Sequence, residues 1–115
     1  MDSSDFVTAI EKHVRDCAVE GTLAQLRRPS GRRVPEDLAA RSEWFNGLSD
    51  EDAQRVQAVI QDAAHSAVLG LLAVLDGARI IDDTRGHFEL FHVAEGRVLI
   101  NPPDLDVHDL LTRIT

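Results

Sequence analysis

Two side chains near the amino terminus are the best suited to nucleophilic chemistry. His13 and Cys17 are four residues apart, which places them one turn apart on a helix. A neighbouring imidazolium lowers the pKa of a thiol, so this pair has the minimum composition of a nucleophile. However, Cys17 also continues an apolar stripe, and the sequence shows neither a third orienting group nor an oxyanion-binding loop. We therefore predict no catalytic residue.

Aspartate and histidine side chains suggest a second kind of chemistry, metal ligation. Asp62 and His65 are three residues apart on an expected helix, so both can reach one ion. Further donors lie elsewhere in the chain: His87, His92, His108 and Asp109. His87 and His92 are five residues apart on an expected strand and so point to opposite faces, and two ligands alone do not hold zinc. We predict no metal site and no cofactor.

Four arginines are crowded into one short segment of an otherwise acidic chain: Arg27, Arg28, Arg32 and Arg33. Two prolines and a glycine break regular structure in the same stretch, which predicts an exposed basic loop over residues 27–35. A guanidinium binds carboxylates and phosphates through two parallel hydrogen bonds, so this loop is a candidate partner-binding site. The alternative is a solvated loop that pairs loosely with the acidic surface of the protein itself.

The overall charge narrows the choice of partners. With 12 basic and 20 acidic residues, the formal net charge of −8 argues against a surface for nucleic acid and favours a basic protein partner. The single cysteine cannot form an internal disulfide, and the amino terminus lacks the basic and apolar regions of a secretory signal. The longest apolar run, Ala67–Leu75, is shorter than the about 20 residues of a membrane span. We expect a cytoplasmic protein without membrane contact.

A small number of elements must position these residues, since 115 residues suffice for one domain and one core. Apolar residues at spacings of three and four predict a first helix that ends near Gly21. Its expected inner stripe is Phe6, Ile10, Val14 and Cys17. Pro35 suits the first turn of a second helix over residues 36–45, with Phe45 facing inward and Trp44 near the edge.

The most informative segment is a long helical pattern from Ser49 to Asp76. Three acidic residues follow Ser49, which is a strong helix start because carboxylates favour the positive end of the helix dipole. The expected inner stripe consists of Ala53, Val56, Ile60, Ala63, Ala67, Leu71 and Val74. If Leu71 lies in the core, Leu71→Ala should cost about 2–5 kcal/mol of stability.

The second half of this helix is apolar on every side. Its polar side ends after Asp62 and His65, where Leu69 and Leu72 follow at helical spacing. Such a helix must be enclosed either by its own chain or by another one. The first option is that the N-terminal helices complete the enclosure; the second is that Leu69, Leu72 and Trp44 contact a partner or a second copy.

The periodicity changes after Gly77, where short runs typical of strands begin. Residues 80–81, 87–93 and 97–101 are predicted strands, the last two joined by a tight hairpin turn, and residues 105–114 a short terminal helix. The sequence thus predicts a single α+β domain over residues 1–115. It has N-terminal helices and a long central helix, followed by a small antiparallel β-meander and a short C-terminal helix.

Three stretches carry a resemblance to other proteins. Trp44–Ser49, Ala67–Gly77 and Leu110–Leu111 resemble the corresponding parts of a group of small, uncharacterised bacterial proteins, a domain of unknown function. The similarity covers roughly residues 43–111. It implies a bacterial cytoplasmic protein of this size and no particular activity.

These observations leave two functional hypotheses. The first is a non-enzymatic interaction or regulatory protein whose acidic surface binds another protein that is basic. In one version of this hypothesis the protein forms a homodimer. The second is a small enzyme or ligand-binding protein with a pocket between the sheet and the 49–76 helix. That pocket would use Asp62, His65, Arg79 and His92.

Overall fold

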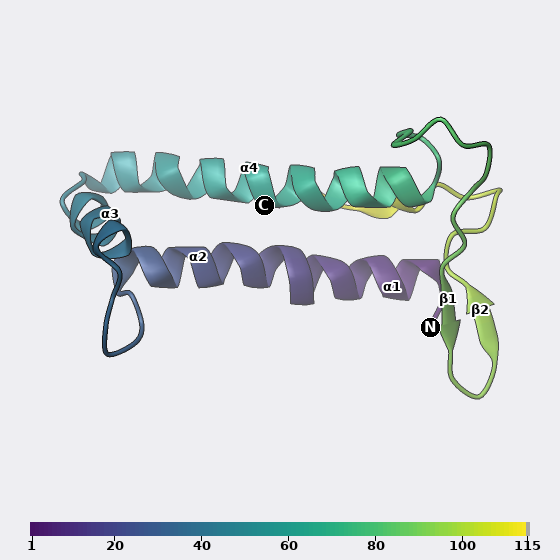
Figure 1. Ribbon diagram of the computed structural model, residues 1–115, viewed down its shortest axis with the longest axis horizontal. Helices are drawn as coiled ribbons and strands as arrows, with labels where there is room; N and C mark the ends of the chain where they lie inside the picture. Colours follow the sequence, from purple (N-terminus) through teal and green to yellow (C-terminus); the bar gives the residue numbers. More distant parts are fainter. Residues whose placement is uncertain (115) are drawn as a thin grey trace.

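Two long antiparallel helical segments form the body of the protein (Figure 1). The computed structural model describes residues 1–114. In chain order its elements are α1 (Ser3–Ile10), the π-helix η1 (Glu11–Asp16), α2 (Cys17–Arg27), α3 (Glu36–Asn46), α4 (Asp50–Leu75), β1 (Phe91–Val93), β2 (Arg97–Leu99) and the 3-10 turn η2 (Val107–Leu110). The first three are continuous, and we call them the N-terminal rod. α3 lies across one end of the body and the β-hairpin at the other.

The helix starts follow from their capping residues. Ser49 caps α4, because its side chain accepts a hydrogen bond from the backbone N–H of Asp52, as the sequence indicates. The first helix is capped by Asp2, which forms a capping box with Asp5. At the other end of α4 the chain turns at Gly77, whose φ of 77° lies in the left-handed region that glycine tolerates.

The π-helical turn changes which side chains of the rod face inward. A π-helix has more residues per turn than an α-helix, so the inner stripe shifts by about one position after η1. Val7 is buried before the turn, and Arg15, Val19 and Leu23 are buried after it. The expected inner stripe is therefore wrong in its second half, where Val14 and Cys17 are exposed. The first helix also continues beyond Gly21 to Arg27.

The inner side of α4 also differs from the expected stripe. Leu71 is 62% exposed and Leu72 only 2%, because the contact residues recur at an average spacing close to 3.6 rather than 3.5. Side chains at positions 64, 68, 72 and 75 therefore replace those at 63, 67, 71 and 74. Leu71 lies outside the core, and the large destabilisation expected for its truncation now belongs to Leu72.

Two core clusters hold the ends of the body together. One is built from the rod, α4, the hairpin and η2, and its buried members are Val7, Leu72, Ile100 and Val107. The other is built from α2 and α3, and its buried members are Val19, Leu23, Leu26 and Phe45. Phe45 is thus a core residue, as expected.

The α+β fold class is confirmed, with a sheet smaller than the predicted meander. β1 and β2 pair antiparallel, with Phe91 opposite Leu99 and Val93 opposite Arg97. Within residues 1–114, the segment 80–81 forms no strand and the terminal helix is reduced to η2. The side chain of Asn101 explains why the chain is ordered here: it donates to the carbonyls of Leu75 and Phe88 and accepts from the N–H of Leu90.

The molecule is elongated because the N-terminal rod and α4 are both long. A helix of 26 residues is about 39 Å long, and the principal extents are 49 × 30 × 29 Å. The radius of gyration is 18.1 Å, whereas a compact domain of 115 residues has about 13 Å. The body is a single layer of two helices, with α3 at one end and the β-hairpin at the other, and it is thinner than a helix bundle.

The corrected inner side of α4 predicts that truncation costs much more stability at an inner position of this helix than at an exposed one. Leu72→Ala should destabilise the protein by about 2–5 kcal/mol, because it leaves a cavity in the core. Val59→Ala should change stability by less than about 1 kcal/mol, because Val59 is 67% exposed. Urea denaturation of both variants measures this difference. Equal losses at the two positions would show that the helix faces the core with another side.

Candidate functional site: an open apolar face

One side of the two-helix layer carries apolar side chains that no other part of residues 1–114 covers. Two grooves follow one another along the N-terminal rod on this side. The first, of about 300 Å³, lies between the start of the rod and the hairpin. The second, of about 580 Å³, lies between α2, α3 and α4. We call the surface formed by these grooves and the adjoining side of α4 the open face.

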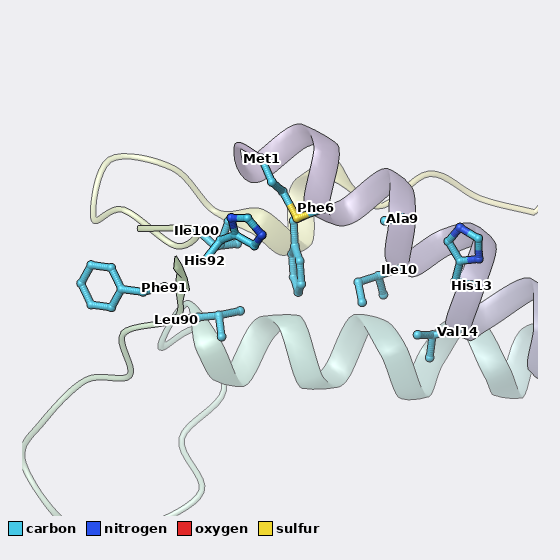
Figure 2. Close-up of a pocket in the computed structure, with 10 residues that line it drawn as sticks. All are labelled: Met1, Phe6, Ala9, Ile10, His13, Val14, Leu90, Phe91, His92 and Ile100. Carbon is cyan, nitrogen blue, oxygen red and sulfur yellow. The ribbon is translucent and has the colours of Figure 1, made fainter. Parts of the chain in front are cut away.

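The first groove is lined by the side chains that were expected to form the inner stripe of the first helix. Figure 2 shows Phe6, Ile10 and Val14 pointing in one row from the rod toward α4. Phe6 and Ile10 are half-buried, and Val14 is 48% exposed. His92 of β1 closes one end of the groove, and His13 lies at the other.

The second groove has small residues along its floor and an aromatic residue at its rim. Ala18 and Gly21 contribute little side-chain volume from α2, and Val56 and Ile60 form the α4 side. Trp44 of α3 lies at the rim and is 54% exposed. A large aromatic beside an apolar hollow is the usual composition of an anchor in a protein interface.

α4 extends the open face beyond the second groove. Ala63, Ala67 and Leu71 follow Val56 and Ile60 at helical spacings of three and four, so all five lie on one side of the helix. The last three are exposed. Val56 and Ile60 pack against the α2–α3 core cluster, as the sequence predicted for the inner side of α4. The later part of the predicted stripe, from Ala63 to Leu71, lies beside the helix contact instead of inside it.

The opposite side of the layer is covered by the end of the chain. The buried guanidinium of Arg15 donates to the carbonyl oxygen of Thr112 and approaches His65 Nδ1 at 3.2 Å. Glu11 accepts from the backbone N–H of Thr112 at 2.7 Å. The segment after η2 is therefore fixed across the rod and α4 on this side of the layer, where a more polar groove remains beside Asp62 and His65. Sequence reasoning missed Arg15, because the π-turn that brings it inward has no clear sequence signal.

The charge distribution separates the open face from the rest of the surface. Of the 20 acidic residues in the chain, none lines either groove within the described part, residues 1–114. The charged or titratable groups there are His13, His92 and the terminal amine of Met1 in the first groove, and Arg41 and the thiol of Cys17 in the second. A protein with a net charge of −8 thus has two neighbouring grooves whose linings carry no carboxylate within residues 1–114.

The amount of exposed surface is far above that of a compact monomer. The protein exposes 8571 Å², whereas a compact monomer of 12.7 kDa exposes about 6,200 Å². The excess is about 2,300 Å². Stable protein interfaces bury about 800 Å² per partner, and obligate ones more. The excess therefore has the size of a protein interface.

α4 itself has the length and composition of a membrane-crossing helix. Its most apolar window of 18 residues is only 17% buried. However, α4 is packed along the rod, which carries the exposed charged residues Lys12 and Glu20. Insertion of α4 into a bilayer together with the rod would place these charges in hydrocarbon, which costs several kcal/mol for each charge.

The predicted partner-binding residues are divided between the core and the surface. Trp44 lies on the open face, as described above. Leu69 is half-buried on the opposite side of α4, and Leu72 is a core residue, so its predicted contact with a partner is wrong. The four loop arginines, Arg27, Arg28, Arg32 and Arg33, are all exposed. The loop of residues 28–35 joins α2 to α3 and is anchored by hydrogen bonds between Ser30 and Gln25.

The residues of the predicted ligand pocket lie in three different grooves. Asp62 and His65 line a groove on the covered side together with Arg113. Arg79 packs its guanidinium over Gly70, where an added Cβ would lie 2.4 Å from Nη1. His92 lies in the first groove of the open face. The structure therefore does not bring the four together. His13 and Cys17 are exposed in successive grooves, and no hydrogen bond joins them among the described residues.

A cluster of polar side chains around Asp76 and His108 closes the end of α4; of these two, the sequence pointed only to His108, as one of several scattered donors. The side chain of Asp76 is only 1% exposed and accepts two hydrogen bonds from His108 through Oδ2, one from the backbone N–H and one from Nδ1 at 2.7 Å. Its other oxygen, Oδ1, has no partner among the described residues. The hydrogen bond to Asp76 raises the pKa of His108 above its ordinary value, with further contributions from Asp109 and Asp106.

This cluster also contains a set of potential metal ligands. Donor atoms of Asp76, Asp106 and His108 lie within 4.8 Å of one another. However, Asp76 Oδ2 already accepts two hydrogen bonds from His108, and the raised pKa of His108 favours the charged form that balances the carboxylate of Asp76 at the negative end of the α4 dipole. We interpret the pair as a structural ion pair that fastens η2 to α4.

No family model, curated protein or solved structure matches this chain. The resemblance of residues 43–111 to small bacterial proteins therefore stays a prediction. The geometry and chemistry of the open face therefore have to indicate what this protein binds.

The Asp76–His108 pair predicts a pH-dependent stability. Because the pKa of folded His108 is raised, its stabilisation is complete below the unfolded value of about 6.5 and is lost as pH rises through the folded value. His108→Ala should remove about 1.5–3 kcal/mol at pH 5.5 and less at pH 9. Urea denaturation at both pH values measures this, with the exposed His87→Ala as control. A loss that is independent of pH would contradict the ion pair.

Proposed function

We propose that the protein is a non-enzymatic interaction protein that binds a protein partner through the open face. The observation that carries this proposal is an apolar surface without carboxylates on a strongly acidic chain, with an excess exposed area of about 2,300 Å². Catalysis requires convergent polar groups, and both grooves are lined mainly by apolar side chains.

The acidic surface has a separate role in this proposal. Its charge of −8 acts on the approach of a partner: it attracts basic groups, and it repels acidic surfaces, including those of a second copy, everywhere except at the open face. Affinity comes from the apolar contact at the open face, so added salt should change the rate of association more than the rate of dissociation. A cytoplasmic location fits this acidic, non-catalytic role and is part of the proposal.

The ligand-binding alternative has less support, because Asp62, His65, Arg79 and His92 do not share a groove. The basic loop of residues 27–35 remains a secondary candidate for contact with carboxylates or phosphates. Its arginines are exposed at the end of the body opposite the hairpin, so a partner on the open face leaves them free.

A charge placed on the open face should abolish partner binding without unfolding the protein. Val14→Glu and Leu71→Glu replace exposed residues on this face, and Ile80→Glu replaces an 84% exposed residue that lines neither groove. Tagged wild-type and variant proteins are isolated from the source organism, and co-purifying protein, including untagged copies of the chain, is quantified. We expect a stoichiometric protein that both open-face variants lose and that Ile80→Glu retains.

Two outcomes would contradict the proposal. Retention of all co-purifying protein by both open-face variants would show that the partner binds elsewhere. Sedimentation of the wild type with phosphatidylcholine vesicles, lost in Val14→Glu, would assign the open face to a lipid surface.

A further inference from the structure

We infer that the partner covering the open face is a second copy of this chain, with the two helical layers packed face to face. This inference rests on the proposed function and names its partner. The charge of the open face and the exposed area and shape of the chain support it.

Charge decides where two copies can meet. Each chain carries −8, so contact between most parts of the surface would bring carboxylates together at a cost of several kcal/mol. The open face is the side on which both linings lack acidic residues, as shown for residues 1–114. A symmetric contact places a surface against its own copy, and an apolar surface without one dominant charge is complementary to itself.

The area also agrees with a homodimer. Obligate homodimers bury about 1,000–2,500 Å² on each chain, and this chain exposes about 2,300 Å² more than a compact monomer of its mass. Burial of an area of this size in a symmetric contact would therefore bring the exposed area of each chain to that of a compact protein.

The shape of the single chain leads to the same assembly. Two layers of two helices, placed face to face, form a four-helix bundle, in which each helix has the neighbours that the single layer lacks. The radius of gyration of one chain, 18.1 Å, is already close to the about 17 Å of a compact body with twice as many residues. A second copy can thus lie alongside without making the particle much longer.

Small side chains along the middle of the open face permit close approach of the second layer. They are Ala18 and Gly21 on α2 and Ala63 and Ala67 on α4. Trp44 stands at one end of the open face, with more than half of its surface exposed. A pair of anchors of this kind, one from each copy, is the expected centre of binding energy in such an interface.

The single cysteine reports on this contact without any added probe site. Cys17 is exposed in one chain and lines the second groove, so a face-to-face dimer covers it. Two measurements are combined: subunit mass by sedimentation over a range of concentrations, and the rate at which dithionitrobenzoate reacts with the Cys17 thiol. Circular dichroism confirms that each variant is folded.

We expect the wild type and Ile80→Glu to be dimers with a slowly reacting thiol. Val14→Glu and Leu71→Glu should weaken the dimer by about 100-fold or more, because each symmetric contact then holds two new carboxylates. Cys17 in these variants should react faster by a similar factor at low protein concentration. Two variants on different helices are used so that a local folding defect in one does not decide the result.

A wild-type chain that stays monomeric at the highest concentrations, with fast thiol reaction, would overturn this inference. If that monomer still captures a different protein that Val14→Glu loses, the proposed function stands and only the identity of its partner changes. If it captures none, both fail. A dimer that both open-face variants retain would place self-association on another surface and would likewise overturn the inference.

Discussion

The structure depends on a single constraint: two long helical segments contact one another along only one line. They are α4, about 39 Å long, and the N-terminal rod of similar length. A helix that is apolar on every side requires neighbours on several sides. In this chain, α4 has the N-terminal rod on one side and the terminal segment on another, and the hairpin and α3 cover only the ends of the body (Figure 1). The open face follows directly from this shortage of neighbours, as do the elongated shape and the large exposed area.

The π-helical turn determines which residues occupy the open face. Without η1, the regular spacing of Phe6, Ile10, Val14 and Cys17 would continue as the inner stripe, and Arg15 would point to solvent. The extra residue in the turn brings Arg15 inward, where it donates to the carbonyl of Thr112. The same rotation turns Val14 and Cys17 outward. One local irregularity thus both fastens the terminal segment on the covered side and exposes apolar residues on the other.

The starts of α3 and α4 were accessible from the sequence, and the rotation of the helices was not. Ser49 with its acidic followers marked the start of α4, and Pro35 marked the start of α3, because capping chemistry is local. The choice between Leu71 and Leu72 as a core residue depends instead on a drift of about 20° per heptad along α4, which a pattern with apolar residues on all sides cannot specify. The pairing of Asp76 with His108 spans 32 residues and depends on where the terminal segment returns, so no spacing rule finds it.

The stripe that the sequence predicted as the core is still informative, because it describes what the residues require. Apolar residues at spacings of three and four indicate a surface that is buried in the functional state, whichever chain buries it. In the rod and in α4 alike, the first part of the predicted stripe packs against a core cluster, and the later part lies beside the line of contact. Both stripes are displaced toward the same open side, and neither groove there is lined by a carboxylate within residues 1–114. Two independent helices that share this displacement point to one common apolar neighbour.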